Sequence, residues 1–194
     1  YYAKQLAHAY LSHFDLNFLF ITGDQIERFQ PPGTGKFLLW ELPFMALGIF
    51  WLVFGRFSKR VKIFLFSWIL ITPIPASITW DVPNSVRILN ILPVPQILVG
   101  IGLIGFFDWI NKLSFSSKIL QKNAKPLFIA IVLFAAVLNI AYYLNQYFVQ
   151  YNYFSAKSWQ YGYEELVPYL QENEKNYERI VVSTKIPLDQ SYIF

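Results

Sequence analysis

Four long runs of apolar residues divide the chain, with polar or basic stretches between them. The runs cover residues 37–54, 63–79, 89–107 and 127–148. The hydrocarbon core of a bilayer takes about 17–25 predominantly apolar residues per helix, and each run has about that length. We therefore expect an α-helical integral membrane protein in which residues 37–148 form a transmembrane region of about four helices.

Prolines interrupt the first three runs. They are Pro43, then Pro73 and Pro75, then Pro93 and Pro95. In lipid, a backbone group that a proline leaves unpaired needs a partner in the protein or in a wet cavity. Two interpretations stay open: the prolines simply end the helices, or the helix ends open around a cavity at one membrane face.

Lysine and arginine concentrate in two of the connections. Residues 55–62 carry four basic residues and no acid, and residues 108–125 carry four lysines opposed only by Asp108. Together these connections hold half of the 16 Lys and Arg residues. Short cytoplasmic loops are enriched in Lys and Arg. We therefore predict a multi-pass protein of the cell membrane whose basic connections are cytoplasmic and whose termini and loop 76–88 are external.

The two flanking segments are expected to lie outside the membrane. Residues 1–36 are rich in Phe and Leu, which predicts an interfacial loop with short helices. In residues 149–194, the apolar positions between Tyr163 and Leu170 follow a helical spacing, and residues 179–184 have the pattern of a buried strand. The last segment therefore predicts the start of a small external α/β domain.

The composition agrees with a bilayer environment. Charged residues make up 14% of the chain, against about 25% in a typical soluble domain, and aromatic residues make up 20%. The net charge of +4 is small and scattered, which argues against nucleic acid as a partner. Because the chain has no cysteine, disulfides and thiolate chemistry are excluded.

The ends of the sequence resemble internal cuts. The chain opens at Tyr1 without the basic and apolar regions of a secretory signal, and it stops soon after the predicted strand. We expect the chain to be a piece of a longer polypeptide that carries part of any site.

Candidate binding residues lie in the first external segment and in loop 76–88. They are Asp24 and Arg28, and Asn84, Ser85 and Arg87. The planar fork of arginine suits phosphate, and Arg87 stands where the third apolar run begins. A guanidinium there would suit the phosphate of a lipid that enters from the membrane. The alternatives are a local ion pair for Asp24 and Arg28, and an interfacial anchor for Arg87.

Metal and nucleophile patterns are weak. His8 and His13 are five residues apart with no third ligand nearby, so we predict no metal site and expect both histidines at the surface or the interface. The Gly/Pro stretch 31–36 lacks the spacing of a phosphate-binding P-loop.

Several short motifs follow one another in a recognisable order. They are Tyr10–Phe14, Phe18–Phe20, Gly23-Asp24, Gly33–Lys36, Glu41–Pro43 with Leu47-Gly48, Pro75–Thr79, Pro83–Arg87 with Leu92-Pro93, and Trp159–Tyr163. This order resembles the C-terminal portion of GT-C membrane glycosyltransferases, the family of the dolichyl-phosphate-mannose–protein mannosyltransferases and the bacterial aminoarabinose transferase. The similarity extends over nearly the whole chain.

The resemblance implies an inverting enzyme that moves a sugar from a polyprenyl-phosphate-linked donor to a protein, lipid or glycan acceptor on the external face. Arg87 matches an arginine that contacts donor phosphate in relatives, and Asp24 and Arg28 match an element facing the donor cavity. Asn84 stands where many relatives have histidine. The catalytic carboxylate of the family lies in an earlier external loop. The resemblance therefore implies no catalytic residue in this chain, and it leaves open a divalent cation in the longer protein.

Two other hypotheses stay open. One is a transporter or flippase fragment, which would place ionisable residues at mid-membrane, where the second to fourth runs carry none. The other is a non-catalytic membrane scaffold whose external part binds a partner.

Overall fold

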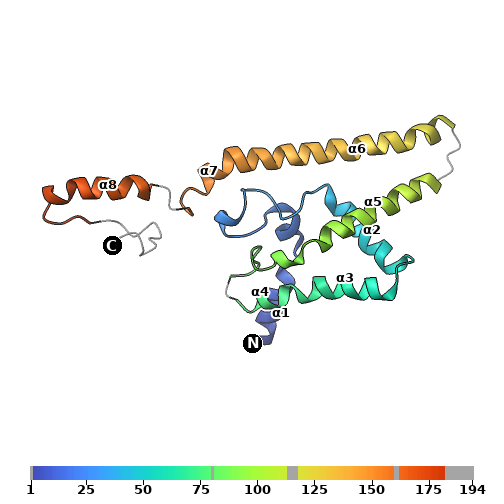
Figure 1. Ribbon diagram of the computed structural model, residues 1–194, viewed down its shortest axis with the longest axis horizontal. Helices are drawn as coiled ribbons and strands as arrows, with labels where there is room; N and C mark the ends of the chain where they lie inside the picture. The colour runs from blue at the N-terminus through green and yellow to red at the C-terminus, as the bar shows by residue number, and fades with distance from the viewer. Residues whose placement is uncertain (1, 80, 113–117, 160–161, 182–194) are drawn as a thin grey trace.

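The computed structural model describes residues 2–79, 81–112, 118–159 and 162–181, and every regular element in these ranges is a helix (Figure 1). The α-helices are α1 (Tyr2–Ser12), α2 (Glu41–Phe54), α3 (Lys59–Ile71), α4 (Pro73–Ser77), α5 (Val94–Lys112), α6 (Lys118–Asn145), α7 (Tyr151–Phe154) and α8 (Tyr163–Asn173). Short 3-10 helices cover Glu27–Phe29, Leu89–Ile91 and Glu174–Asn176, and π-helical turns cover Asn17–Ile21 and Gln146–Gln150.

Three helical stretches are long and apolar enough to cross a membrane. They are Lys59–Ser77, Leu89–Lys112 and Lys125–Phe154. The remaining apolar helix, α2, has 14 residues. At 1.5 Å per residue it is about 21 Å long, which is less than the roughly 30 Å of a hydrocarbon core. The prediction of spanning length is therefore confirmed for three of the four runs.

The first run is shorter than predicted because its opening residues are held by the loop before it. Residues 37–40 form turns, and α2 begins only at Glu41. The Phe37 N–H donates to the Leu19 carbonyl at 2.8 Å, and the Leu38 N–H donates to the Glu41 carboxylate at 2.9 Å. These two hydrogen bonds hold the backbone N–H groups of Phe37 and Leu38 in a loop, so α2 starts only after them.

The helices also extend into the two basic connections. α3 already begins at Lys59, where the Ser58 hydroxyl accepts the Val61 N–H, as an N-cap does. α5 continues to Lys112 and α6 starts at Lys118. The predicted bounds 55–62 and 108–125 were therefore too wide, since lysine is a good helix former and α6 continues through Pro126. Residues 113–117 lie outside the described residues.

α2 and α5 pack against each other at glycines. A methyl group on Gly48 would collide with the Leu98 backbone, and one on Gly102 would collide with the Phe44 backbone. The Trp51 ring covers Gly105 in the same way. Small residues at a helix interface let the two backbones approach closely, which is the main source of attraction between helices in lipid.

A small apolar core surrounds this contact. Leu52 of α2, Leu65 of α3, and Val94 and Leu98 of α5 are buried against one another. α6 joins the group through Phe128, whose ring lies 4.3 Å from that of Phe106, centroid to centroid. The apolar stretch of α6 is otherwise open along its length, as a lipid-facing helix would be.

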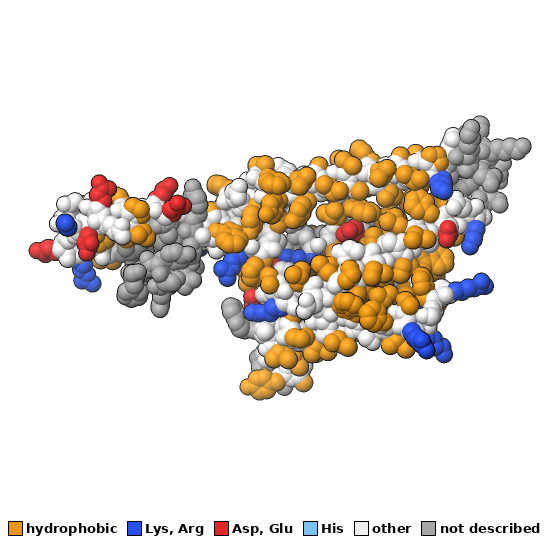
Figure 2. Space-filling view, viewed as in Figure 1, with side chains coloured by type: hydrophobic (Ala, Val, Ile, Leu, Met, Phe, Trp, Pro, Cys, Tyr) orange, Lys and Arg blue, Asp and Glu red, His pale blue; other side chains and the backbone are white. Residues whose placement is uncertain are grey.

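Charge is distributed unevenly over the helices. Figure 2 shows hydrophobic side chains along the helical body, Lys and Arg side chains at the end where α2 meets α3 and α5 ends, and further Lys and Arg side chains toward the opposite end. The basic ends of the helices thus lie on the same side, which agrees with two connections sharing one membrane face. The topology itself stays a prediction.

The C-terminal segment differs from its prediction. The amphipathic helix is present as α8, but residues 179–181 form no strand, and 182–184 lie outside the described residues. The described ranges contain no other strand that could pair with this segment, and an isolated strand gains no ladder hydrogen bonds. The predicted α/β character is therefore wrong for the described part of the chain.

Replacing Gly102 with alanine is expected to destabilise the α2–α5 contact by about 1–3 kcal/mol, because the added methyl forces two backbones apart. Gly100→Ala is the matched control on the same helix, since a methyl there has no neighbour within 4 Å. Thermal unfolding in detergent should show a lowered midpoint for Gly102→Ala alone. Equal midpoints for the two variants would contradict the packing described.

Candidate functional site

Two loops from different parts of the chain meet at a buried carboxylate. Asp24 is 7% exposed, and its Oδ2 accepts both the backbone N–H of Ser85 at 2.9 Å and the Ser85 hydroxyl at 2.8 Å. Its Oδ1 accepts the N–H of Ile26 at 3.0 Å. Asp24 thereby joins loop 22–36 to loop 78–88, and we call this contact the Asp24–Ser85 clasp.

The amide of Gln30 holds the loop around Asp24. Its Oε1 accepts the Asp24 N–H at 2.6 Å, and its Nε2 donates to the carbonyls of Asp24 and Thr22. Gly23 supports this turn with a φ of +66°, a conformation that favours glycine. The carboxylate of Asp24 is therefore fixed before any ligand arrives.

Asn84 organises the second loop. Its side chain is 2% exposed; Oδ1 accepts the N–H groups of Val86 and Arg87, both at 3.1 Å, and Nδ2 donates to Asp81 at 3.0 Å. Every polar atom of this side chain thus has a partner within the loop. Asn84 shapes the backbone that carries Arg87.

The guanidinium of Arg87 is both exposed and anchored. Its Nη1 donates to the Thr79 hydroxyl at 2.6 Å and to the Asp81 carbonyl at 3.3 Å. The remaining guanidinium nitrogens have no partner among the described residues, so they can donate to a ligand. An oriented cation with free donors suits an anionic oxygen group.

His13 lies beneath this loop and is buried, so the expectation of a surface or interfacial position was wrong. The ring is 1% exposed, its Nδ1 donates to the Ala9 carbonyl at 2.9 Å, and its Nε2 accepts the Asn84 N–H at 3.4 Å. These bonds require the neutral ring. Burial lowers the pKa of His13, against the opposing charge of Asp24 and two backbone hydrogen bonds. No local pattern in the sequence marks this contact, because its partner Asn84 lies 71 positions away.

Lys36 completes the polar group around Asp24. Burial lowers the pKa of its amine to about 8, although the negative charge of Asp24 opposes the shift. The Nζ lies 5.8 Å from the centroid of the Phe18 ring. This lysine was part of a sequence motif but was not predicted as a site residue.

Arg28 does not join this group. Its side chain is exposed and lies 5.5 Å from the centroid of the neighbouring Phe29 ring. It forms no ion pair with Asp24 in the described chain, so the local ion pair considered for these residues is not found. The structure brings together Asp24, Ser85 and Asn84 around Arg87, and leaves Arg28 apart.

An apolar cavity of about 300 Å³ opens next to the histidine. Its walls come from α2, α3, α5 and the segment 13–20, and its lining includes His13, Phe20, Met45, Ile69 and Pro95. Both interpretations of the prolines find support, because Pro95 lines this cavity while Pro73 begins α4 and Pro93 directly precedes α5. One of its lining residues, His13, also bonds to Asn84 in the loop that carries Arg87.

The end of α6 and the turn after it hold loop 22–36 from the other side. The hydroxyl of Tyr142 donates to the Gly33 carbonyl at 3.1 Å, and that of Tyr151 donates to the Arg28 carbonyl at 2.8 Å. The Ser155 hydroxyl, 1% exposed, donates to the Glu27 carbonyl at 3.0 Å. Loop 22–36 is therefore braced by two separate parts of the chain.

The described residues do not suit a bound metal. No three His, Asp or Glu side chains in that part of the chain lie close enough to share an ion. Asp24 already accepts three hydrogen bonds, so its oxygens would have to leave their partners to become ligands. A divalent cation would need ligands from elsewhere.

Comparison with known proteins assigns the chain to no family. No protein-family model matches the chain, and no curated protein or solved structure does so. The GT-C resemblance therefore remains a prediction.

Removing the Asp24 carboxylate should destabilise the clasp. Asp24→Ala leaves the half-buried donors of Ser85 and Ile26 without acceptors, at an expected cost of about 2–3 kcal/mol. Asp15→Ala is the control, because its carboxylate accepts only one N–H, from Asn17, at an exposed site. Unfolding in detergent measures both; equal effects would show that the clasp is not important for stability.

Acid should weaken the same region through His13. Its folded pKa lies below the unfolded value of about 6.5, so the unfolded chain binds more protons in between, and stability falls as pH drops below about 6.5. The unfolding midpoint of the wild type should therefore fall more than that of His13→Gln between about pH 7.5 and about pH 5. Parallel curves for the two proteins would rule out this role of the ring.

Proposed function

We propose that this chain is part of a membrane glycosyltransferase that moves a sugar from a polyprenyl-phosphate-linked donor to an acceptor on the external face of the cell membrane. The observation that carries the proposal is Arg87, an exposed and anchored guanidinium in a loop whose Asn84 N–H bonds to His13, a residue that lines an apolar cavity. The order of sequence motifs supports it.

In this proposal Arg87 binds the donor phosphate. One of its terminal nitrogens is held by Thr79 and Asp81, which fixes the plane of the guanidinium and leaves its other donors for phosphate oxygens. Charge-assisted hydrogen bonds of this kind are roughly twice as strong as neutral ones. Asn84, Ser85 and Asp24 then act as positioning residues, because their polar atoms are used within and between the two loops.

The apolar cavity suits a segment of the polyprenyl chain. Its lining is almost wholly hydrocarbon, and it reaches His13, whose ring accepts the N–H of Asn84 three residues before Arg87. Burial of an isoprenoid segment gains roughly 25 cal/mol per Å² of apolar surface. Phosphate and lipid tail would thus be bound by adjoining parts of one structure.

In this proposal the catalytic residue lies in a part of the longer protein outside this chain. The resemblance puts the family's catalytic carboxylate in an earlier external loop, and the carboxylate of Asp24 is buried and already accepts three hydrogen bonds, which fits a structural role. The contribution proposed for this chain is donor binding on the face opposite the basic connections, which the distribution of Lys and Arg makes cytoplasmic.

Arg87→Gln should weaken binding of a short-chain polyprenyl phosphate to the protein in nanodiscs by about tenfold or more, which corresponds to about 1.4 kcal/mol. Arg87→Lys should fall between the wild type and Arg87→Gln, because an ammonium keeps the charge but lacks the fork. Arg60→Gln, at the basic end of the helices, serves as the control and should bind as the wild type does. Fluorescence-based titration measures all four.

Wild-type affinity in Arg87→Gln would overturn the proposal and favour a non-catalytic scaffold. An equal loss in Arg60→Gln would mean that the lipid phosphate responds to the overall positive charge rather than to the site at Arg87.

A further inference from the structure

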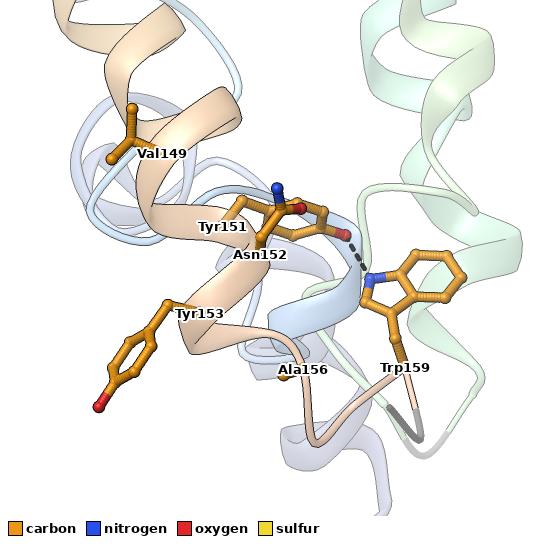
Figure 3. A pocket seen from close by; sticks show the side chains of 6 residues that line it. All are labelled: Val149, Tyr151, Asn152, Tyr153, Ala156 and Trp159. Carbon is orange, nitrogen blue, oxygen red and sulfur yellow. Dashed lines mark hydrogen bonds between the residues drawn. The ribbon is translucent and has the colours of Figure 1, made fainter. Parts of the chain in front are cut away.

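A second pocket, separate from the apolar cavity, lies at α7 and the turn that follows it. It has a volume of about 840 Å³ and is lined by Val149, Tyr151, Asn152, Tyr153, Ala156 and Trp159 (Figure 3). Its size falls within the range of small-molecule sites in proteins. None of the lining side chains is charged.

The indole of Trp159 is exposed yet fixed. Its ring is 60% exposed, while its Nε1 donates to the Tyr151 hydroxyl at 2.8 Å, as the dashed line in Figure 3 shows. The Tyr151 hydroxyl in turn donates to the Arg28 carbonyl, and the backbone N–H of Trp159 donates to the Ser155 carbonyl at 3.0 Å. A large aromatic ring is therefore held in place with its face available.

A free amide stands beside this ring. The side chain of Asn152 is exposed and has no hydrogen-bond partner among the described residues, so it offers two donors and an acceptor. In the view of Figure 3, Tyr153 and Trp159 lie on either side of Ala156, with Asn152 above them. The pocket thus combines aromatic surface with an unused amide.

We propose that this pocket binds a neutral saccharide. A sugar ring presents C–H groups on its faces and hydroxyl groups around its edge. The C–H face packs on the negative face of an aromatic ring, and the hydroxyls bond to an amide. The absence of charged lining residues disfavours phosphate or a carboxylate ligand and leaves an uncharged ring as the ligand that fits.

The pocket is joined to the proposed donor site through loop 22–36. Tyr151 bonds to Arg28, and Ser155 and Ser158 bond to Glu27, within the same loop that carries Asp24. The assignment of this pocket as an acceptor subsite rests on the proposed transferase function. With that assignment, the acceptor is a glycan rather than a protein or a lipid. Saccharide binding itself does not depend on the donor.

The competing explanation is an aromatic anchor at the membrane interface, where Tyr and Trp are enriched. An anchoring indole turns its N–H toward water or headgroups. Here the indole N–H of Trp159 donates to the Tyr151 hydroxyl. Trp159 lies on a turn outside the spanning helices, and the surface beside it forms a pocket. These three features favour a bound ring.

The test is saturation-transfer NMR of the chain in nanodiscs with cellobiose, mannobiose and chitobiose as probes, without donor lipid. We expect at least one disaccharide to bind, with affinity lowered about tenfold in Trp159→Ala and about threefold or more in Asn152→Ala. Trp159→Phe keeps an aromatic face and should bind more tightly than Trp159→Ala. Trp109→Ala, which removes an exposed indole from α5, should leave binding unchanged.

Three results would overturn the inference. They are no binding of any probe, wild-type binding in both Trp159→Ala and Asn152→Ala, or quenching of Trp159 fluorescence by brominated lipid acyl chains, which would make the indole a membrane anchor. Because the Asn152 side chain has no hydrogen-bond partner in the described part of the chain, Asn152→Ala keeps the test valid if Trp159→Ala fails to fold. Loss of donor binding in Arg87→Gln, with sugar binding retained, would separate the two sites.

Discussion

A buried carboxylate joins the parts of this protein that lie at one end of its helices. Asp24 accepts the backbone and side-chain donors of Ser85, and the 3-10 turn Glu27–Phe29 is the one regular element among the described residues of the two loops. An ionised group with little exposure persists only when its oxygens are hydrogen-bonded. The clasp therefore fixes where loop 78–88 sits, and with it the direction of Arg87. His13 and Asn84 extend the same network to α1, so loops that are distant in sequence act as one unit.

The apolar helices are held together by a different interaction, close packing of their backbones. Hydrocarbon offers no hydrophobic drive between helices, so association depends on close contact between backbones. Gly48 and Gly102 permit that contact between α2 and α5. Because α2 is short, its N-terminal end stops beside the segment 13–20 and leaves an apolar cavity there. The packing that holds the bundle together thus also shapes the space proposed for the lipid tail.

Much of this arrangement follows from local sequence, and some of it does not. Runs of apolar residues and the Lys and Arg bias predict the helices and their shared basic end, because both depend on composition along a single segment. The helix ends at Lys59 and Lys112 were misplaced, since lysine belongs equally well to a loop and a helical turn. The burial of His13 and the partnership of Asp24 with Ser85 depend on residues about 60 to 70 positions apart, which no local pattern encodes. Arg87 was singled out from its residue type and its place before the third apolar run, and its phosphate-binding role stays a prediction. The supporting roles of Asn84 and Ser85 became visible only from their hydrogen bonds.

The central claim is that a polyprenyl phosphate binds at the end of the helices where Arg87 lies. Photo-crosslinking in membranes tests it most directly, with a polyprenyl phosphate that carries a diazirine next to the phosphate and with mass spectrometry to locate the adducts. The account predicts adducts on residues 79–91 and on segment 13–20, which compete with unlabelled lipid phosphate. Adducts confined to the lipid-facing surface of α6, or to the basic end of the helices, would contradict it.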